Sequence, residues 1–272
     1  MNDWREYPDA DGPGHTVTGT VRVLHGLRSP QLGNARDLLV YLPPSYGTGG
    51  RRYPVLYMHD GQNLFDEATS FGREWDVDRT LDDASAEGIE AIVVGIPNMG
   101  ELRIAEYAPW TDARVGGGRG DDYLRFLVET VKPLIDTDFR TRPEREATGI
   151  AGSSMGGLIS LYGFFRHPGT FGFCGAMSPS LWFAGNAILP FIESSPFVPG
   201  RIYLDIGTRE GAVAVQHVAH LRELLLRKGY RRRRDLLVVV ETGGRHEETA
   251  WARRLHRELR FLLSGMRGSD PR

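Results

Sequence analysis

The segment Gly152-Ser153-Ser154-Met155-Gly156 carries the strongest chemical signal in this chain of 272 residues. Its G-x-S-x-G spacing is typical of a sharp turn between a strand and a helix, in which the flanking glycines relieve crowding around an exposed serine. Apolar residues 148–151 precede the turn, and the helix-like residues 155–162 follow it. We therefore predict that Ser154 is a nucleophile. A turn that binds phosphate, or one without any chemistry, is the alternative.

The same turn should also help to stabilise negative charge. A helix that starts directly after Ser154 points its N-terminus at a developing oxyanion, and the backbone N–H of Met155 is then the first hydrogen-bond donor. With this type of turn, a second donor comes from the loop after an earlier strand. Here the loop 59–63 follows the apolar residues 55–58, and it leaves Gly61 and Gln62 as alternatives.

Attack by a serine hydroxyl near pH 7 requires a general base, and histidine has the appropriate pKa range. The chain contains eight histidines. In the chain order that accompanies this turn, the base follows the last strand of the sheet. Apolar residues 236–240 fit that strand, and His246 lies in the loop after it. We predict that His246 is the base, because the other histidines fall in helical or strand-like stretches or beside the oxyanion loop.

The carboxylate that orients the base should precede it in the chain, just beyond the strand predicted over residues 202–206. Glu210 lies in that loop, two residues after Thr208. Asp205 is the alternative, but it falls inside the strand, remote from a histidine at the carboxyl edge. We favour Glu210, whose role would be to hold the tautomer of His246 and to stabilise the imidazolium.

These residues need a scaffold that brings the ends of several strands to one edge. Period-two alternation over residues 16–23, followed by residues 37–42, predicts an antiparallel pair at one side of a sheet. Beyond this pair, short apolar runs alternate with helical stretches, as in parallel βαβ units. The predicted buried strands cover residues 55–58, 91–96, 148–151, 171–176, 202–206 and 236–240, and the predicted helices cover residues 77–86, 121–135, 155–167, 213–228 and 248–263. The predicted fold class is α/β, with about eight mostly parallel strands and helices on both faces.

Composition excludes several classes of protein. Hydrophobic residues make up 40% and charged residues 25% of the chain, and the formal net charge of -2 does not favour nucleic acid as a partner. The length suits one large domain, which we assign to residues 15–265, with a polar N-terminal segment over 1–14 and a tail over 266–272.

No apolar stretch indicates a secretory signal or a membrane span, so we expect a cytoplasmic location. Cys174 is the one cysteine, and we expect it to be buried.

Two segments at the carboxyl edge are candidates for shaping a substrate pocket. Residues 178–182 follow one predicted strand and end in Trp182, while Trp75 precedes the first predicted helix. Both tryptophans are candidates for the wall of an acyl or alcohol pocket, with covering the rim of the core as the equal alternative. The irregular excursion over residues 97–120 leaves the same edge and supplies Arg103 as a further substrate-binding candidate.

With these residues identified, the chain resembles the putative-esterase family of α/β hydrolases, which includes enterochelin esterases, feruloyl esterase modules, S-formylglutathione hydrolases and mycolyltransferases. The resemblance extends over roughly residues 17–263 and rests on the stretches 40–44, 53–65, 149–157 and 243–246. It implies the α/β-hydrolase fold. It also carries the roles of nucleophile and base to Ser154 and His246, with Glu210 standing where feruloyl esterase relatives have aspartate.

The resemblance implies a serine hydrolase that cleaves a carboxylic ester of a small molecule through an acyl-enzyme on Ser154. Acyl transfer to a sugar or an alcohol would use the same residues, and a binding protein that has kept the fold without catalysis is the remaining alternative. No cofactor is expected, and no cysteine cluster or His-x-x-x-His pair supplies zinc ligands. The sequence predicts no nucleic-acid or membrane partner and does not predict an oligomeric state.

Overall fold

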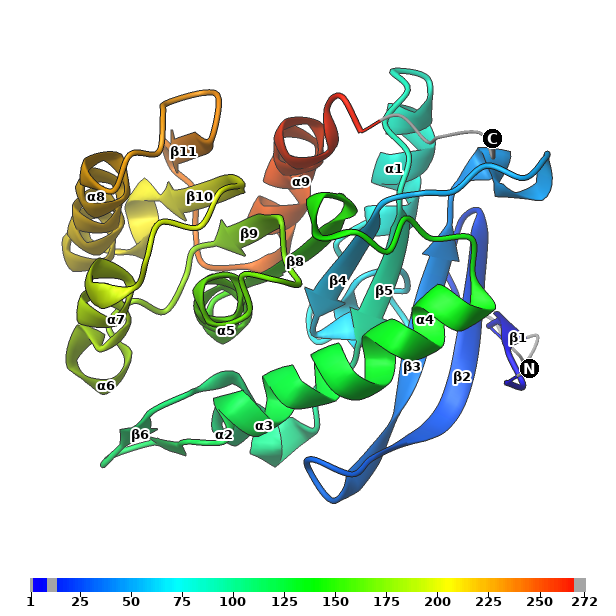
Figure 1. Cartoon of the computed structure of the whole chain (residues 1–272), viewed down its shortest axis with the longest axis horizontal. Coiled ribbons are helices and arrows are strands. Elements are labelled where there is room, and N and C mark those ends of the chain that lie inside the picture. Colours follow the sequence, from blue (N-terminus) through cyan, green and yellow to red (C-terminus); the bar gives the residue numbers. More distant parts are fainter. Residues whose placement is uncertain (1, 9–13, 267–272) are drawn as a thin grey trace.

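A computed structural model of the chain describes residues 2–8 and 14–266. Within them nine strands form one sheet in the order β1-β2-β3-β5-β4-β8-β9-β10-β11 (Figure 1). These strands are β1 (Arg5–Tyr7), β2 (Thr20–Ser29), β3 (Asn34–Leu42), β4 (Val55–His59), β5 (Ile92–Ile96), β8 (Thr148–Ser153), β9 (Phe173–Met177), β10 (Arg201–Gly207) and β11 (Leu236–Glu241). A separate pair joins β6 (Thr111–Asp112) to β7 (Gly116–Gly117). The α/β prediction is confirmed, with one strand more in the sheet than the eight expected.

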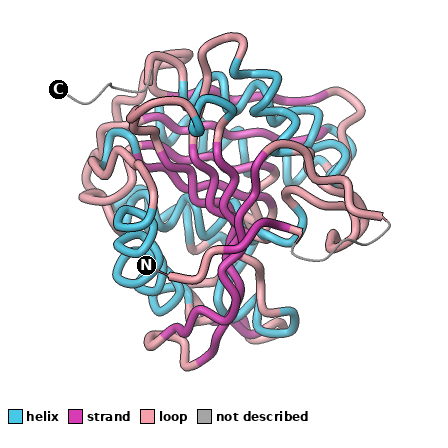
Figure 2. Tube along the Cα trace, turned by 90° about the vertical axis from the view of Figure 1, so that its right-hand side faces the viewer, coloured by secondary structure: helices cyan, strands magenta, loops and turns pink. Residues whose placement is uncertain are grey.

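The pairing of neighbouring strands changes from antiparallel to parallel at β5. The pairs β1–β2, β2–β3 and β3–β5 are antiparallel, and every pair from β5 across to β11 is parallel. Figure 2 shows the strands as one layer through the middle of the molecule, with helices on both sides. Because parallel strands end at a common edge, the loops after β4, β8, β9, β10 and β11 all emerge on the same side of the sheet.

The additional strand β1 comes from the segment that we expected to lie outside the domain. Arg5 lies opposite Val23 of β2, and Tyr7 lies opposite Val21. Three residues are too few to produce a recognisable alternation of polar and apolar side chains, which explains why the sequence does not predict this strand. Residues 1 and 9–13 of the expected N-terminal segment, and 267–272 of the expected tail, lie outside the described residues.

Helices cover both faces of the sheet. The α-helices are α1 (Val77–Ser85), α2 (Arg103–Tyr107), α3 (Gly120–Arg125), α4 (Lys132–Asp138), α5 (Met155–Arg166), α6 (Phe183–Asn186), α7 (Ile188–Ser194), α8 (Ala212–Arg227) and α9 (Glu248–Leu263). Apolar side chains of α1 and α9 pack in one core cluster, while those of α3, α5, α7 and α8 pack in another. Figure 1 shows α1 and α9 on the opposite face of the sheet from α3 and α5. The helix predicted over residues 121–135 is present as one continuous helical run, in which π-helical turns over Phe126–Val131 join α3 to α4 (Figure 1).

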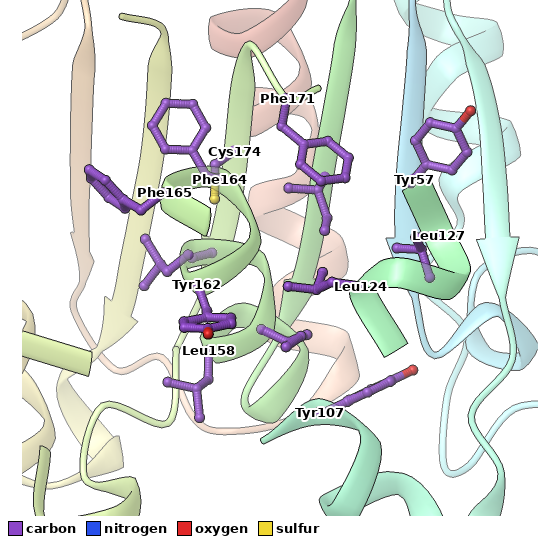
Figure 3. Packing of buried hydrophobic residues seen from close by; sticks show 14 of the residues in the cluster. Tyr57, Tyr107, Leu124, Leu127, Leu158, Tyr162, Phe164, Phe165, Phe171 and Cys174 are labelled. Atoms are coloured by element: carbon purple, nitrogen blue, oxygen red, sulfur yellow. The ribbon is translucent and has the colours of Figure 1, made fainter. Parts of the chain in front are cut away.

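The core is rich in aromatic side chains around α5. Figure 3 shows Phe164, Phe165 and Phe171 beside Cys174 on this face of the sheet. The thiol is fully buried, and burial raises its pKa well above the usual value. The prediction that Cys174 is a small buried residue is therefore confirmed. Among residues 2–8 and 14–266, no helix combines the length and apolar character needed to span a bilayer.

Candidate active site

Ser154 occupies the turn between β8 and α5, as the sequence predicts. Its backbone adopts φ 56° and ψ −119°, a conformation that costs free energy for a residue with a side chain. The glycines on either side make room for the imidazole of His59. A Cβ atom added at Gly152 would lie 3.0 Å from His59 Cδ2, and one added at Gly156 would lie 3.2 Å from His59 Cβ. The G-x-S-x-G spacing therefore reflects close packing against β4 as well as the shape of the turn.

Three predicted residues meet in one hydrogen-bonded chain. The Oγ atom of Ser154 lies 3.0 Å from Nε2 of His246, and Nδ1 of His246 lies 2.7 Å from Oε2 of Glu210. They come from the loops after β8, β11 and β10, which are far apart in the sequence and meet at the carboxyl edge. The imidazole is 45% exposed and the carboxylate only 3%. The base thus reaches solvent while its carboxylate partner does not.

The carboxylate of Glu210 is held by donors on both oxygens. Its Oε1 atom accepts hydrogen bonds from the hydroxyl of Ser178, over 2.7 Å, and from the backbone N–H of Gly207, over 2.8 Å. Burial by itself favours the neutral acid, but the hydrogen bonds from His246, Ser178 and Gly207 oppose it and hold the pKa of Glu210 below its usual value. The group is therefore ionised at neutral pH and able to stabilise an imidazolium.

Asp205, the alternative acid, has a different position. It lies on β10, is fully buried, and makes no hydrogen bond to His246 within the described part of the chain. Its Oδ1 atom accepts the backbone N–H of Ser178 over 3.0 Å, and its Oδ2 atom binds Nε of Arg254 over 2.8 Å. Burial raises its pKa to about 6 despite the arginine. This geometry favours Glu210 as the partner of the base.

Residues 178–182 after β9, which are candidates for shaping a pocket, include two serines that contact Ser154 and Glu210. Ser178 Oγ, besides donating to Glu210, accepts hydrogen bonds from Nε1 of Trp251 (3.0 Å) and Nη2 of Arg254 (3.2 Å). Ser180 Oγ lies 3.2 Å from Ser154 Oγ. The position of residues 178–182 at the carboxyl edge was the available signal, but it did not indicate which side chains face the triad.

The oxyanion candidates lie around the same turn. Met155 is the first residue of α5, so its backbone N–H is at the N-terminus of that helix, beside Ser154. Gln62 lines the cavity that contains Ser154 and His246, and its Oε1 atom accepts the backbone N–H of Asn98. Gly61 packs against β5, where an added Cβ would lie 2.5 Å from the carbonyl carbon of Gly95. Of the two alternatives, Gln62 is therefore the one positioned at the cavity.

A cavity of about 380 Å³ opens beside the nucleophile. Its lining includes Ser154, His246, Glu248, Trp251, the exposed Phe71 and a group of polar side chains from the neighbouring loops, namely Asp60, Gln62, Asn63, Asn98 and Arg103. The predicted substrate-binding residue Arg103 is thus at the site. Its guanidinium binds Asp60 through two hydrogen bonds, of 2.7 Å from Nε and 2.8 Å from Nη2. One side of the cavity is therefore polar, and on that side the charges of Arg103 and Asp60 are paired with each other.

Neither predicted tryptophan lines this cavity. Trp75 is only 2% exposed and packs against Trp251 with ring centroids 5.6 Å apart, so its position favours the core over the pocket wall, the two alternatives that the sequence left equal. Trp182 is 46% exposed and stacks at an angle on Phe183, outside the lining. Trp251, which the sequence analysis did not single out, contacts both the cavity and the imidazole, with ring centroids 5.0 Å apart.

His59, the other histidine near the site, is buried and unsuited to act as a base. Its Nδ1 atom lies 2.7 Å from the hydroxyl of Tyr123, and burial lowers its pKa to about 3. It therefore shapes the loop around the turn in its neutral form. Across the described part of the chain, no group of three or more His, Cys, Asp or Glu side chains is arranged to hold a metal ion.

Comparison with known proteins places the chain in a family. The family model described as "Putative esterase" matches residues 29–262. The "Uncharacterized protein YbbA" of Bacillus subtilis is 28% identical over 256 residues, which cover 89% of this chain and 98% of that protein. The siderophore triacetylfusarinine C esterase of Aspergillus fumigatus is 32% identical over 158 residues, or 56% of this chain and 51% of that protein. The crystal structure of enterochelin esterase from Shigella flexneri superposes with a TM-score of 0.74 at 19% identity, covering 93% of this chain and 60% of that chain.

The sheet order, the strand-turn-helix around Ser154 and the structural similarity define an α/β hydrolase. Because the family model covers most of its length, the chain belongs to this esterase family and is a carboxylic ester hydrolase. The chain spans about half the length of the Aspergillus esterase that it matches.

Proposed function

We propose that the protein hydrolyses a carboxylic ester of a small molecule through a covalent acyl-enzyme on Ser154. The observation that carries this proposal is the unbroken hydrogen-bonded chain from Ser154 Oγ through His246 to Glu210. Neutral imidazole is the acceptor that a serine hydroxyl requires, and an ionised carboxylate on the far nitrogen keeps the proton on Nδ1.

In the acylation step, Ser154 Oγ attacks the ester carbonyl carbon while its proton moves to Nε2 of His246. The carbonyl electrons move to oxygen, and Glu210 stabilises the positive charge on the imidazolium. When the tetrahedral intermediate collapses, the bond to the alcohol oxygen breaks. The imidazolium then gives its proton to that leaving alcohol. The result is an acyl group in ester linkage to Ser154 and a regenerated neutral His246.

In the deacylation step, a water molecule takes the place of the alcohol. His246 removes a proton from the water as the water oxygen attacks the acyl carbon, and the second tetrahedral intermediate releases Ser154 with the proton returned to Oγ. The 45% exposure of the imidazole supports this step, because water can approach Nε2 without rearrangement of the buried Glu210.

Stabilisation of the two oxyanions falls to backbone N–H groups. We assign the first donor to Met155 at the N-terminus of α5 and the second to Gln62, which lines the cavity. Removal of one such donor in a serine hydrolase costs about 10²–10³ in kcat. The polar side of the cavity, formed by Asp60, Asn98 and Arg103, would contact the part of the ester farther from the carbonyl. A small-molecule substrate is supported by the cavity volume and by the siderophore esterase among the relatives.

Trapping the acyl-enzyme tests the proposal directly. A p-nitrophenyl ester should release nitrophenol and leave its acyl group on the peptide that contains Ser154, detected by mass spectrometry after a rapid acid quench. A panel of esters graded in acyl size then identifies the preferred acyl group. The control is Ser154→Ala, which should acquire no acyl group. Acylation of another residue, or turnover by Ser154→Ala at a rate near that of the wild type, would contradict the proposed mechanism.

A further inference from the structure

The segment after β9 folds over the back of the nucleophile. The backbone N–H of Ser180 donates to the carbonyl oxygen of Ser154 over 2.9 Å, and the backbone N–H of Ser154 donates to the carbonyl oxygen of Met177 over 3.0 Å. These two bonds fix the segment against the turn. They leave the hydroxyl of Ser180 3.2 Å from Ser154 Oγ, in a position where the Ser180 residue is only 3% exposed. Among the described residues, Ser154 Oγ is the one hydrogen-bond partner of this hydroxyl.

The direction of this hydrogen bond follows from counting protons along the chain. In the neutral form of His246, which is the form that accepts the proton of Ser154, the ionised Glu210 can only accept, so Nδ1 carries the single imidazole proton and Nε2 is an acceptor. The single hydroxyl proton of Ser154 is then used in the bond to Nε2. Ser154 Oγ has no second proton to give to Ser180. The contact between the two hydroxyls must therefore have Ser180 as donor and Ser154 as acceptor.

We propose that Ser180 is a further catalytic residue, whose hydroxyl donates a hydrogen bond to the nucleophilic oxygen of Ser154 and stabilises negative charge on that oxygen. This inference rests on the proposed acyl-enzyme mechanism. It adds a donor on the nucleophile itself, separate from the two backbone donors assigned to the carbonyl oxygen.

Charge develops on Ser154 Oγ twice in each turnover. During acylation the proton leaves for His246 while the bond from Oγ to the carbonyl carbon is still forming. During deacylation that bond breaks, Oγ takes the electron pair, and the imidazolium returns the proton to it. In both steps the Ser180 hydroxyl keeps its own proton, so no proton or electron is gained or lost through it. A hydrogen bond to a partly ionised oxygen is stronger than one to a neutral hydroxyl, so it favours the transition state over the ground state.

Because of its position, the Ser180 side chain should affect the rate of the reaction and not the binding of the substrate. The Ser180 side chain does not line the 380 Å³ cavity beside the nucleophile. Removal of the hydroxyl should therefore lower kcat and leave KM nearly unchanged. The expected loss is roughly tenfold, the size of effect associated with one hydrogen bond of ordinary strength.

The test compares Ser180→Ala with Ser180→Thr, which keeps a hydroxyl, and with Ser160→Ala as a matched control. Ser160 is also a buried serine near the turn, but its hydroxyl donates to the carbonyl oxygen of Gly156 and has no contact with Ser154. Three quantities are measured for each variant: kcat and KM with a p-nitrophenyl ester, the rate constant for labelling by a fluorophosphonate probe, and Tm. Labelling depends on the attack by Ser154 and needs no deacylation.

We expect Ser180→Ala to lose roughly tenfold in both kcat and labelling rate at unchanged Tm, Ser180→Thr to recover most of the loss, and Ser160→Ala to match the wild type. If Ser180→Ala does not fold, Ser180→Cys gives the same comparison, because a thiol keeps the volume but is a weak donor. Wild-type labelling and kcat in Ser180→Ala or Ser180→Cys, with Ser154→Ala inactive, would overturn the role of Ser180 alone. An active Ser154→Ala would instead overturn the acyl-enzyme mechanism on which it rests.

Discussion

Nε of Arg254 binds Oδ2 of Asp205 over 2.8 Å, in a buried ion pair directly next to Glu210, the carboxylate proposed to orient the base. The same guanidinium lies 4.0 Å from Oε1 of Glu210 and donates to the hydroxyl of Ser178. Asp205 therefore fixes the residues that hold Glu210, while Glu210 contacts the base. The two carboxylates, which the sequence left as alternatives for one role, occupy two different positions in the same network.

This division of roles predicts different defects for two similar substitutions. Glu210→Gln should lower kcat by about 10²–10⁴, because the amide no longer enforces the tautomer of His246, and should change Tm little. Asp205→Asn should act mainly on folding, because it leaves the buried charge of Arg254 without its main partner. We expect a loss of about 3 kcal/mol in the free energy of unfolding. Steady-state kinetics and urea unfolding of both variants check the assignment. The reverse pattern, with Asp205→Asn stable but inactive, would move the acid to Asp205.

The nucleophile gives the sharpest prediction of rate. Ser154→Ala should lose on the order of 10⁴–10⁶ in kcat, as triad serines do in other hydrolases. Its Tm should stay close to that of the wild type, because the side chain is not part of either core cluster. Activity is measured with a chromogenic ester and folding by circular dichroism. A variant with more than a tenth of wild-type activity would be incompatible with Ser154 as nucleophile.

The meeting of Ser154, Glu210 and His246 was predictable because each follows a strand in a fixed chain order. Ser154, Glu210 and His246 come after β8, β10 and β11, and parallel strands bring those ends together whatever the details of packing. The contacts of Ser178 and Ser180 were not predictable in the same way. They depend on the register that places Ser153 opposite Met177, and on the left-handed backbone of Ser178 at φ 42°. No local pattern in the sequence indicates either feature.

The direction of the Trp75 side chain was also not predictable from the local sequence. Its chain position near the carboxyl edge is as expected, but its ring turns into the core, where it packs on Trp251 of α9. The direction of the ring depends on packing against a helix more than 170 residues later in the chain, and the local sequence around Trp75 does not indicate this contact. Trp251 lines the cavity, a position for which Trp75 and Trp182 were only candidates, with covering the core as the equal alternative.

The proposed mechanism also predicts how activity responds to pH and to chelators. Ser154 attacks only when His246 is neutral, so kcat/KM should rise with pH in a single protonation step and then level off. Incubation with a strong chelator should leave the rate unchanged, because the proposed base and nucleophile are both side chains. The pH profile is measured from pH 5 to 9 with a non-ionisable ester. Loss of activity with chelator, followed by recovery with a divalent metal, would exclude the serine mechanism.

A buried carboxyl group on α9 predicts a pH-dependent stability that is independent of catalysis. Both oxygens of Glu258 are buried without a hydrogen-bond partner among the described residues, and the carboxyl group packs so closely that a Cβ added at Gly175 would lie 1.6 Å from Oε1. Burial raises the pKa of Glu258 well above its usual value, and the nearby charge of Asp205 raises it further. Burial in the folded protein therefore favours the neutral form of this group over the charged form.

In the unfolded chain Glu258 ionises near its ordinary pKa of about 4.3, so above that pH the folded state binds one proton more than the unfolded state. The contribution of this group to stability is fully present below that pH, and it falls by about 1.4 kcal/mol for each further pH unit until the folded group also ionises. Glu258→Gln and Glu258→Met remove the titration. Their Tm relative to the wild type should therefore increase as the pH rises from 5 to 8, by several degrees in total. Scanning calorimetry across this range checks the prediction, with Glu101→Gln, an exposed glutamate, as the control. A difference in Tm that stays constant with pH would show that Glu258 is already ionised in the folded protein.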